Sequence, residues 1–176
     1  LNCLVCVNCL PAVWQKGTAT FYGDGGSGGH CGGADLGNYG KGDSWIDGLY
    51  VATNSFMWCG LTNPCGNTHA PDCGRCYEVR CTGTDTNTDG YVPCVASATV
   101  TVAVTDECPA TSGHCGGKVN HFDLSTMAFK TIANVKAGVI HMEYRQVSCK
   151  PGGNLKLAIK SGSTQWWLEV APKDAA

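Results

Sequence analysis

One carboxylate stands out in this chain because apolar residues flank it on both sides. Asp123 lies between Phe122 and Leu124, and the residues that follow continue into a largely apolar segment. A carboxylic acid held against apolar groups keeps its proton near neutral pH and can donate that proton to a leaving oxygen. Asp123 is therefore the first candidate for a catalytic acid. The alternative is a structural aspartate that accepts hydrogen bonds from the amides of a helix beginning near Ser125.

Neighbouring polar side chains could act together with this carboxyl group. His121 precedes Asp123 by two residues and could orient it, but the five histidines of the chain lack the spacing of metal ligands, so we expect no metal and no other cofactor. Thr20 and Tyr22 should point to one side of a strand because side chains alternate along a strand. They would then line one groove beside Asp123. The alternative is ordinary packing, with Phe21 on the opposite side.

The composition limits the classes of protein to consider. The chain has 176 residues, of which 43% are hydrophobic and 15% charged, with 24 glycines. This balance favours one domain plus a fragment of a second, with many turns and short strands. The net charge of -2, without a lysine or arginine cluster, argues against a nucleic-acid partner. No apolar run approaches the roughly 18 to 20 residues that span a bilayer, which argues against a membrane partner.

Thirteen cysteines indicate an oxidising compartment, and hence a secreted, extracellular protein. No cleavable signal peptide is visible, which favours a mature form. The odd count leaves at least one thiol unpaired or linked to another molecule. Cys3, Cys6 and Cys9 open the chain at every third residue. This spacing could hold a metal with a fourth ligand from elsewhere, but the oxidising context favours a disulfide-pinned strap.

The elements that must position the candidate residues are mostly strands. Runs rich in β-branched or aromatic residues predict strands at 17–22, 76–81, 98–105 and 139–147. A single helix is expected over 125–135, with Ser125 as its N-cap. Residues 34–75 carry turn signals and are expected to form loops. The glycine-rich segment 23–29 lacks the lysine of a phosphate-binding loop.

The tail differs from the rest of the chain. Two further strands are expected at 155–160 and 166–170, joined near Gly162. An isolated hairpin is only marginally stable in water, so the tail must either dock on the main domain or begin a second one. Trp166 and Trp167 could form an apolar platform, although neighbours in a strand face opposite sides and one of them could belong to a core.

Several segments together resemble the first domain of expansins. They occur in order over residues 17–150 and comprise Thr18-Ala19-Thr20-Phe21-Tyr22-Gly23, Cys73-Gly74-Arg75-Cys76-Tyr77-Glu78-Val79-Arg80-Cys81, Val104-Thr105-Asp106-Glu107-Cys108-Pro109, and His121-Phe122-Asp123-Leu124 through to Tyr144-Arg145. Expansins share this domain with family 45 glycoside hydrolases. The resemblance implies an all-β fold, a six-stranded double-psi β-barrel with one short helix. The stretch from Lys160 to Trp167 is similar to the opening of the second, carbohydrate-binding domain of microbial expansins.

This resemblance implies three parts. Residues 1–16 would be the cysteine-rich strap, residues 17–150 the barrel domain, and residues 151–176 a partial second-domain hairpin or a docked tail. The implied disulfides are Cys31–Cys73, Cys76–Cys149, Cys81–Cys94, Cys59–Cys65 and Cys108–Cys115, of which the last two are also favoured by their close spacing.

The same resemblance suggests roles for the candidate residues. Asp123 corresponds to the acid of the hydrolases, Asp24 falls where their base would lie, and Asp106 resembles an aspartate found in both families. Each has a structural alternative, since Asp24 and Asp106 could merely form or cap a turn. The expected ligand is a polysaccharide. Its candidate contact residues are Thr20, Tyr22, His121, Trp166 and Trp167, with Trp58 as a weaker candidate.

Three functions remain open. The favoured one is an expansin-like protein of the cell wall that binds cellulose or other β-glucans as a monomer and loosens them without sustained hydrolysis. The second is an inverting endo-β-1,4-glucanase, with Asp123 as acid and Asp24 as base. The third is a barwin-like carbohydrate-binding module in which Asp123 is structural. If the carboxyl groups of Asp24 and Asp123 lay well beyond about 10 Å apart, they could not share the water that inversion requires.

Overall fold

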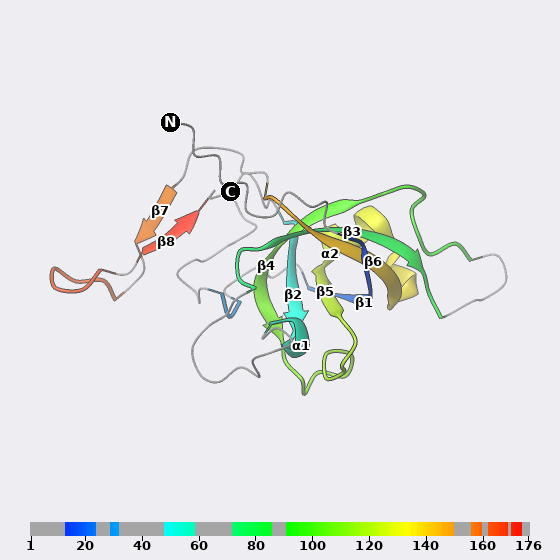
Figure 1. The fold of residues 1–176 in the computed structure, drawn as a ribbon, viewed down its shortest axis with the longest axis horizontal. Helices are drawn as coiled ribbons and strands as arrows, with labels where there is room; N and C mark the ends of the chain where they lie inside the picture. Colours follow the sequence, from blue (N-terminus) through cyan, green and yellow to red (C-terminus); the bar gives the residue numbers. More distant parts are fainter. Residues whose placement is uncertain are drawn as a thin grey trace.

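Six strands from distant parts of the chain close into one barrel. The structure is a computed structural model, and it describes residues 13–23, 29–31, 48–58, 72–85, 91–149, 156–159, 162–168 and 170–173. The barrel strands are β1 (Gln15–Tyr22), β2 (Tyr50–Asn54), β3 (Cys76–Gly83), β4 (Val100–Cys108), β5 (His121–Ser125) and β6 (Ile140–Val147). Their order around the barrel is β1-β5-β2-β4-β3-β6 (Figure 1). The expected six-stranded all-β barrel is confirmed.

Two of the strand pairs are parallel, and both help to place the candidate carboxylates. β1 pairs in parallel with β5, which sets Thr20 opposite Asp123. β2 pairs in parallel with β4 and, on its other side, antiparallel with β5. Ala52 is consequently in register with both Asp106 and Asp123. The chain thus brings two carboxylate-bearing strands to either side of one short, buried strand.

The barrel interior is filled by the inward side chains of all six strands and of the helix. The buried core contains Ala19, Val51, Tyr77, Val79, Val100, Val102, Val104, Phe122, Leu124, Ala128, Phe129, Ile132, Ile140, Met142 and Tyr144. Alternation along β1 puts Ala19 in this core, with Phe21 packed against it, and leaves Thr18, Thr20 and Tyr22 on the other side of the strand. The face predicted for Thr20 and Tyr22 follows directly from this packing.

The predicted helix is present but shorter than expected. α2 spans Thr126–Ile132, and Ser125 is its N-cap, with its hydroxyl accepting a hydrogen bond from the Ala128 amide. A 3₁₀ turn, η2 (Val135–Ala137), follows it. A four-residue helix, α1 (Ser55–Trp58), extends β2 within the region expected to form loops. Together β2 and α1 correct that expectation over residues 50–58.

The tail forms a two-stranded antiparallel sheet of β7 (Lys156–Ile159) and β8 (Val170–Lys173). A strand was predicted at 166–170, and this boundary is wrong, because Trp166 and Trp167 precede β8. The hydroxyl of Thr164 accepts hydrogen bonds from both tryptophan amides, and the Thr164 amide donates to the Trp167 carbonyl oxygen. These bonds close a turn that a strand cannot share. Among the described residues, no helix is long and apolar enough to cross a membrane.

Disulfides tie the barrel at four described positions. Cys31 is joined to Cys73, Cys76 to Cys149, Cys81 to Cys94 and Cys108 to Cys115. The first three pairs were implied by the family resemblance, and Cys108–Cys115 was expected from its close spacing. Cys59, Cys65 and the three N-terminal cysteines lie outside the described residues, as does most of the segment expected to be a strap.

Candidate functional site

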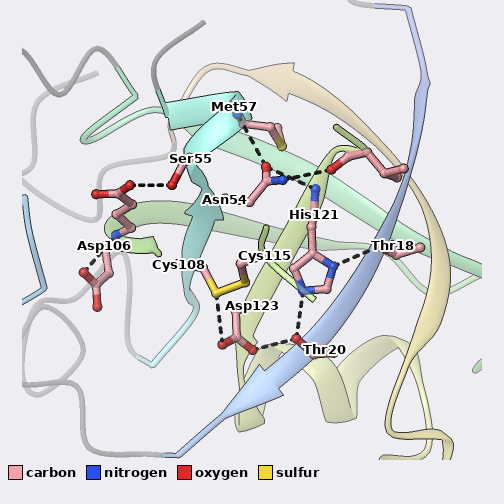
Figure 2. Close-up of a disulfide and its surroundings, with 12 residues drawn as sticks. Thr18, Thr20, Asn54, Ser55, Met57, Asp106, Cys108, Cys115, His121 and Asp123 are labelled. Carbon is pink, nitrogen blue, oxygen red and sulfur yellow. Dashed lines mark hydrogen bonds between the residues drawn. A yellow bond between two sulfur atoms is a disulfide. The ribbon is translucent and has the colours of Figure 1, made fainter. Parts of the chain in front are cut away.

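The site is built around a hydrogen bond between two strands that are distant in the sequence. Because Thr20 on β1 is in register with Asp123 on β5, its hydroxyl donates to Asp123 Oδ1 at 2.9 Å (Figure 2). The residues are 103 positions apart. A hydrogen bond to the charged form of a carboxyl group favours that form. Thr20 therefore both fixes the rotamer of Asp123 and limits how firmly it holds a proton.

His121 is part of the same network and reaches Asp123 only through Thr20. Its ring is 1% exposed, with Nδ1 2.8 Å from Thr18 Oγ1 and Nε2 2.9 Å from Thr20 Oγ1. When Thr20 donates its single proton to the Asp123 carboxylate, it must accept from His121 Nε2–H, and His121 Nδ1 must then accept from Thr18. Burial, and the neighbouring His114 ring to a lesser degree, lower the pKa of His121 to about 4. The ring is neutral at pH 7 and orients the acid indirectly.

The surroundings of Asp123 favour its protonated form on balance. Burial raises the pKa of Asp123, and the nearby Asp106 carboxylate raises it further, while Thr20 and His114 lower it. Cys108 Sγ lies 3.9 Å from Asp123 Oδ2, and since it is bonded to Cys115 it has no proton to give. A weakly polar sulfur atom at this distance does not solvate a charge well. The expectation of an acid in apolar surroundings therefore fits the geometry.

His114 adds a second imidazole above the first. It lies in the short loop closed by the Cys108–Cys115 disulfide, exposed to solvent, and its ring stacks on that of His121 with 5.9 Å between centroids and 19° between planes. The disulfide thus holds an ionisable group near Asp123. The sequence reasoning missed this residue, because only the fold brings it over the network.

Asp106 is held by backbone amides rather than by other side chains. Its Oδ1 atom accepts hydrogen bonds from the amides of His30 and Glu107, each at 2.8 Å. Gly29 passes so close that a Cβ atom there would overlap the Thr105 carbonyl oxygen and the Asp106 side chain. The segment 29–31 is anchored by the Cys31–Cys73 disulfide. Asp106 is consequently a fixed acceptor near the end of β4. Its bond to the Glu107 amide fits the predicted turn cap, whereas its bond to the His30 amide joins two segments that are distant in the sequence.

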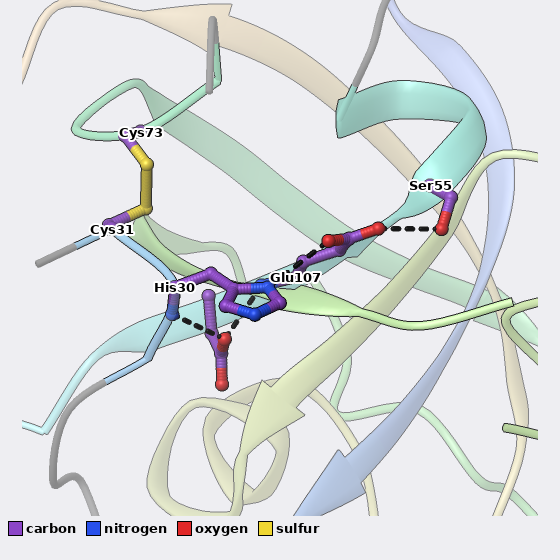
Figure 3. A network of polar contacts seen from close by, with 6 residues as sticks. His30, Cys31, Ser55, Cys73 and Glu107 are labelled. Atoms are coloured by element: carbon purple, nitrogen blue, oxygen red, sulfur yellow. Dashed lines mark hydrogen bonds and ion pairs between the residues drawn. A yellow bond between two sulfur atoms is a disulfide. The ribbon is translucent and has the colours of Figure 1, made fainter. Parts of the chain in front are cut away.

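Glu107, for which no role was predicted, connects three parts of this region. Its Oε1 atom accepts from the Ser55 hydroxyl at 2.7 Å, and its Oε2 atom lies 3.1 Å from His30 Nδ1 (Figure 3). Ser55 begins α1, so the unpredicted helix is tied to the loop that clamps Asp106. These partners come from segments with no local spacing relationship, and only the structure could reveal them.

Tyr22 packs against the buried cluster of Ala52, Cys108 and Cys115. Burial first, and then the charges of Asp106, Tyr50 and Asp123, raise the pKa of the Tyr22 hydroxyl. Its ring packs edge-on against Tyr50, with centroids 5.6 Å apart. The phenol remains protonated at all ordinary pH values and can donate to a ligand oxygen.

The remaining predicted contact residues do not all fall in this cluster. Trp166 and Trp167 are 87% and 65% exposed, so neither is buried by the rest of this chain. Trp58 is the last residue of α1, and its side chain is outside the described part. Asp24 also lies outside the described residues, so its role as a base stays a prediction. Within the described part of the chain, no three metal-binding side chains gather.

Comparisons with known proteins agree with the fold described above. A double-psi β-barrel family model described as lytic transglycolase matches residues 63–144. The β-1,4-D-endoglucanase Cel45A of the blue mussel Mytilus edulis superposes with a TM-score of 0.52 at 18% identity, covering 77% of this chain and 79% of that chain. This likeness shows the fold alone. The barrel is thus a double-psi β-barrel.

Expansins provide the more extensive matches. Expansin-B16 of Oryza sativa subsp. japonica is 36% identical over 169 residues, covering 89% of this chain and 54% of the rice protein. Expansin-A21 of Arabidopsis thaliana is 35% identical over 154 residues, covering 87% and 52%. An expansin of Clavibacter michiganensis, solved as a variant in complex with cellohexaose, superposes with a TM-score of 0.61 at 25% identity, covering 93% of this chain and 64% of that chain. The chain is a homologue of the expansins and spans about half the length of these curated relatives.

Proposed function

We propose that this chain is part of a secreted, expansin-like protein of the cell wall, which binds cellulose or related β-glucans and loosens their association without sustained hydrolysis. The observation that carries the proposal is the extent of the likeness. The barrel from Gln15 to Val147 makes up about three-quarters of the chain. The expansin structure covers 93% of the chain, which is more than the barrel, so the likeness to that expansin extends beyond the barrel.

The side chains around Asp123 supply the kinds of donor and acceptor that bind a neutral glucan. The carboxyl group of Asp123 and the phenol of Tyr22 can donate protons to ligand oxygens, while Asp106 is a fixed acceptor. Each hydrogen bond between a glucan and this surface replaces one between neighbouring glucan chains. Loosening requires only such an exchange, and no covalent bond is broken.

The exposed tryptophans supply the second part of the proposal. Sugar rings present C–H groups that pack on aromatic faces, and exposed aromatic side chains are a frequent basis of carbohydrate binding. Trp166 and Trp167 lie in the turn before β8 with most of their surfaces open. We assign residues 151–176 to the beginning of a second, glucan-binding domain. The barrel surface would then engage a chain that the aromatic surface retains.

Disulfides support secretion in this proposal, since such bonds persist in oxidising compartments. The proposed protein acts as a monomer on polysaccharide, with neither nucleic acid nor membrane as partner. Inverting hydrolysis remains the second candidate, favoured by the raised pKa of Asp123. It also requires a base across the glycosidic bond, and Asp24 is the residue proposed for it.

Release of reducing ends from carboxymethylcellulose or phosphoric-acid-swollen cellulose separates the two candidates. We expect no sustained release from the wild-type chain. Sustained release that is abolished by both Asp24→Asn and Asp123→Asn would establish the glucanase instead. Thr82→Ala, which changes an exposed residue of β3 away from Asp123, is the control variant and should behave as wild type.

Wall extension or weakening of filter paper tests loosening itself. The proposal expects wild-type protein to weaken paper and Asp123→Ala to lose this effect while still folding. If Asp123→Ala weakened paper as well as wild type, Asp123 would be structural and the barwin-like binding module would be the better description.

A further inference from the structure

A pocket of about 520 Å³ opens at the end of the barrel where β1, β3 and β5 begin and β6 ends. This volume is within the range of pockets that hold small ligands. Gln15 lines it, whereas Thr20 of the Asp123 network lies five residues further along β1. At roughly 3.3 Å per residue, the two sites are about 17 Å apart along the strand. The pocket therefore lies towards the other end of β1 from Thr20 and Asp123, with Asn120 in its lining directly before His121.

Two buried tyrosines form the floor of this pocket, and both hydroxyl groups are tied to its walls. Tyr77 and Tyr144 pack edge-on with centroids 5.7 Å apart. The Tyr77 hydroxyl donates to Asp72 Oδ1 at 2.7 Å, and the Tyr144 hydroxyl donates to Gln15 Oε1 at 2.9 Å. The floor is thus rigid, and the Gln15 amide is fixed with its NH₂ group still able to donate.

The charged side chains that line the pocket, Asp72 and Arg75, are paired with each other. Asp72 is 1% exposed, and Arg75 Nη1 lies 3.4 Å from its Oδ1 atom, while the arginine side chain itself is 46% exposed. Burial raises the pKa of Asp72. Its Oδ2 atom is buried without a regular hydrogen bond, and the Thr53 hydroxyl faces the same carboxyl group also without one. Because Arg75 is already paired with Asp72, the pair offers no unpartnered charge to an ionic ligand, which favours a neutral one.

The rim combines amide groups with apolar surface. Gln146 makes no side-chain hydrogen bond among the described residues, and Asn120 uses only its NH₂ group, towards Lys16. Phe56 and Met57 from α1 supply the apolar part. Amides that pair with hydroxyl groups, beside an aromatic ring that packs on C–H groups, are the features by which proteins recognise an uncharged sugar ring.

We propose that this pocket binds a residue of a neutral glycan, as a site distinct from the cluster at Asp123. Arg75, Gln15 and Gln146 donate to its hydroxyl groups, Asn120 accepts from them, and Phe56 packs on its apolar face. The inference deepens the proposed function, since it takes a neutral β-glucan as the ligand class. A glycan held at both places would be anchored on two sides of the barrel.

Cellotetraose titrated into the ¹⁵N-labelled chain tests this inference by two-dimensional NMR. We expect saturable shifts at the amides of Gln15, Arg75, Asn120 and Gln146, and the same shifts in an Asp123→Asn variant. Gln146→Ala, which removes an exposed side chain without a partner, should weaken binding at these positions about tenfold. Thr82→Ala, outside the pocket, should leave it unchanged.

The inference is overturned if cellotetraose shifts only residues around Asp123, or none at all, or if Gln146→Ala binds as tightly as Thr82→Ala. Because the readout is the position of the shifts, a loss of stability in one variant does not hide the answer. Retention of the protein on insoluble cellulose is measured in parallel. Binding to cellulose without shifts at the pocket refutes this inference alone, whereas loss of cellulose binding with shifts retained refutes the proposed function alone.

Discussion

Replacing Thr20 by valine removes the hydrogen bond that lowers the pKa of Asp123, together with the contact between Thr20 and His121 Nε2. Valine keeps the β-branched shape but removes the hydroxyl that donates to Asp123 Oδ1 at 2.9 Å. This bond lowers the pKa of Asp123 against the effect of burial, so its loss must raise the pKa. A hydrogen bond to a charged group contributes about 1.5 to 3 kcal/mol, and one pKa unit corresponds to about 1.4 kcal/mol. Because solvent weakens the interaction at this half-buried carboxyl group, we expect the pKa of Asp123 to rise by about 1 in the variant.

The assay is a ¹³C NMR titration of the Asp123 carboxyl carbon. The chain offers a matched control in Thr18→Val, because the Thr18 hydroxyl contacts His121 Nδ1 and not the carboxyl group. Thr18→Val should change the pKa of Asp123 by no more than a few tenths. If Thr20→Val leaves the pKa unchanged or lowers it, or if both variants behave alike, the hydrogen bond does not control the acid and the network has been misread.

Three further outcomes follow from burial and exposure. Since the pKa of His121 falls from 6.5 to about 4 on folding, the folded state binds fewer protons, and its free energy of unfolding should drop by about 3 kcal/mol from pH 6.5 to 4; urea denaturation should show this slope in wild type and His141→Gln but not in His121→Asn. Burial raises the pKa of Asp123 above 3.8, so ionisation destabilises the folded state as pH rises through the folded pKa. Asp123→Asn should therefore unfold a few degrees higher than wild type at pH 7 in calorimetry, and an equal or lower midpoint contradicts this. Trp166→Ala with Trp167→Ala should reduce retention on cellulose severalfold with an unchanged midpoint, because both rings are mostly exposed; undiminished retention would remove them from the binding surface.

Local patterns were enough to predict the strands whose two faces differ. β1, β3, β4 and β6 were each expected within two or three residues of their observed ends. β2 was missed because every one of its five residues is buried, which leaves no alternation to detect. β5 was not predicted as a strand because polar His121 and Asp123 interrupt its short apolar sequence. Only the family resemblance supplied the count of six.

The candidate site could be predicted only where the type of a residue and its immediate neighbours indicate its chemistry. An acid between apolar neighbours led to Asp123, and strand alternation led to Thr20 and Tyr22. Glu107 and His114 escaped notice because their partners are distant in sequence and ordinary in type. The boundary of β8 was misplaced because Thr164 captures two backbone amides, an effect that strand propensity does not include.

The pairing of β1 with β5 also determines when the site comes into being during folding. Thr20 and Asp123 are 103 residues apart, and neither is positioned until the first and fifth strands of the barrel lie side by side. Contacts of such separation carry a large loop-closure cost and form late. A nascent chain in which β5 has not yet been synthesised has no Thr20–Asp123 pair. Partly folded forms in which β1 and β5 are still apart lack this pair as well. Activity should therefore reappear on refolding together with barrel closure, and never before it.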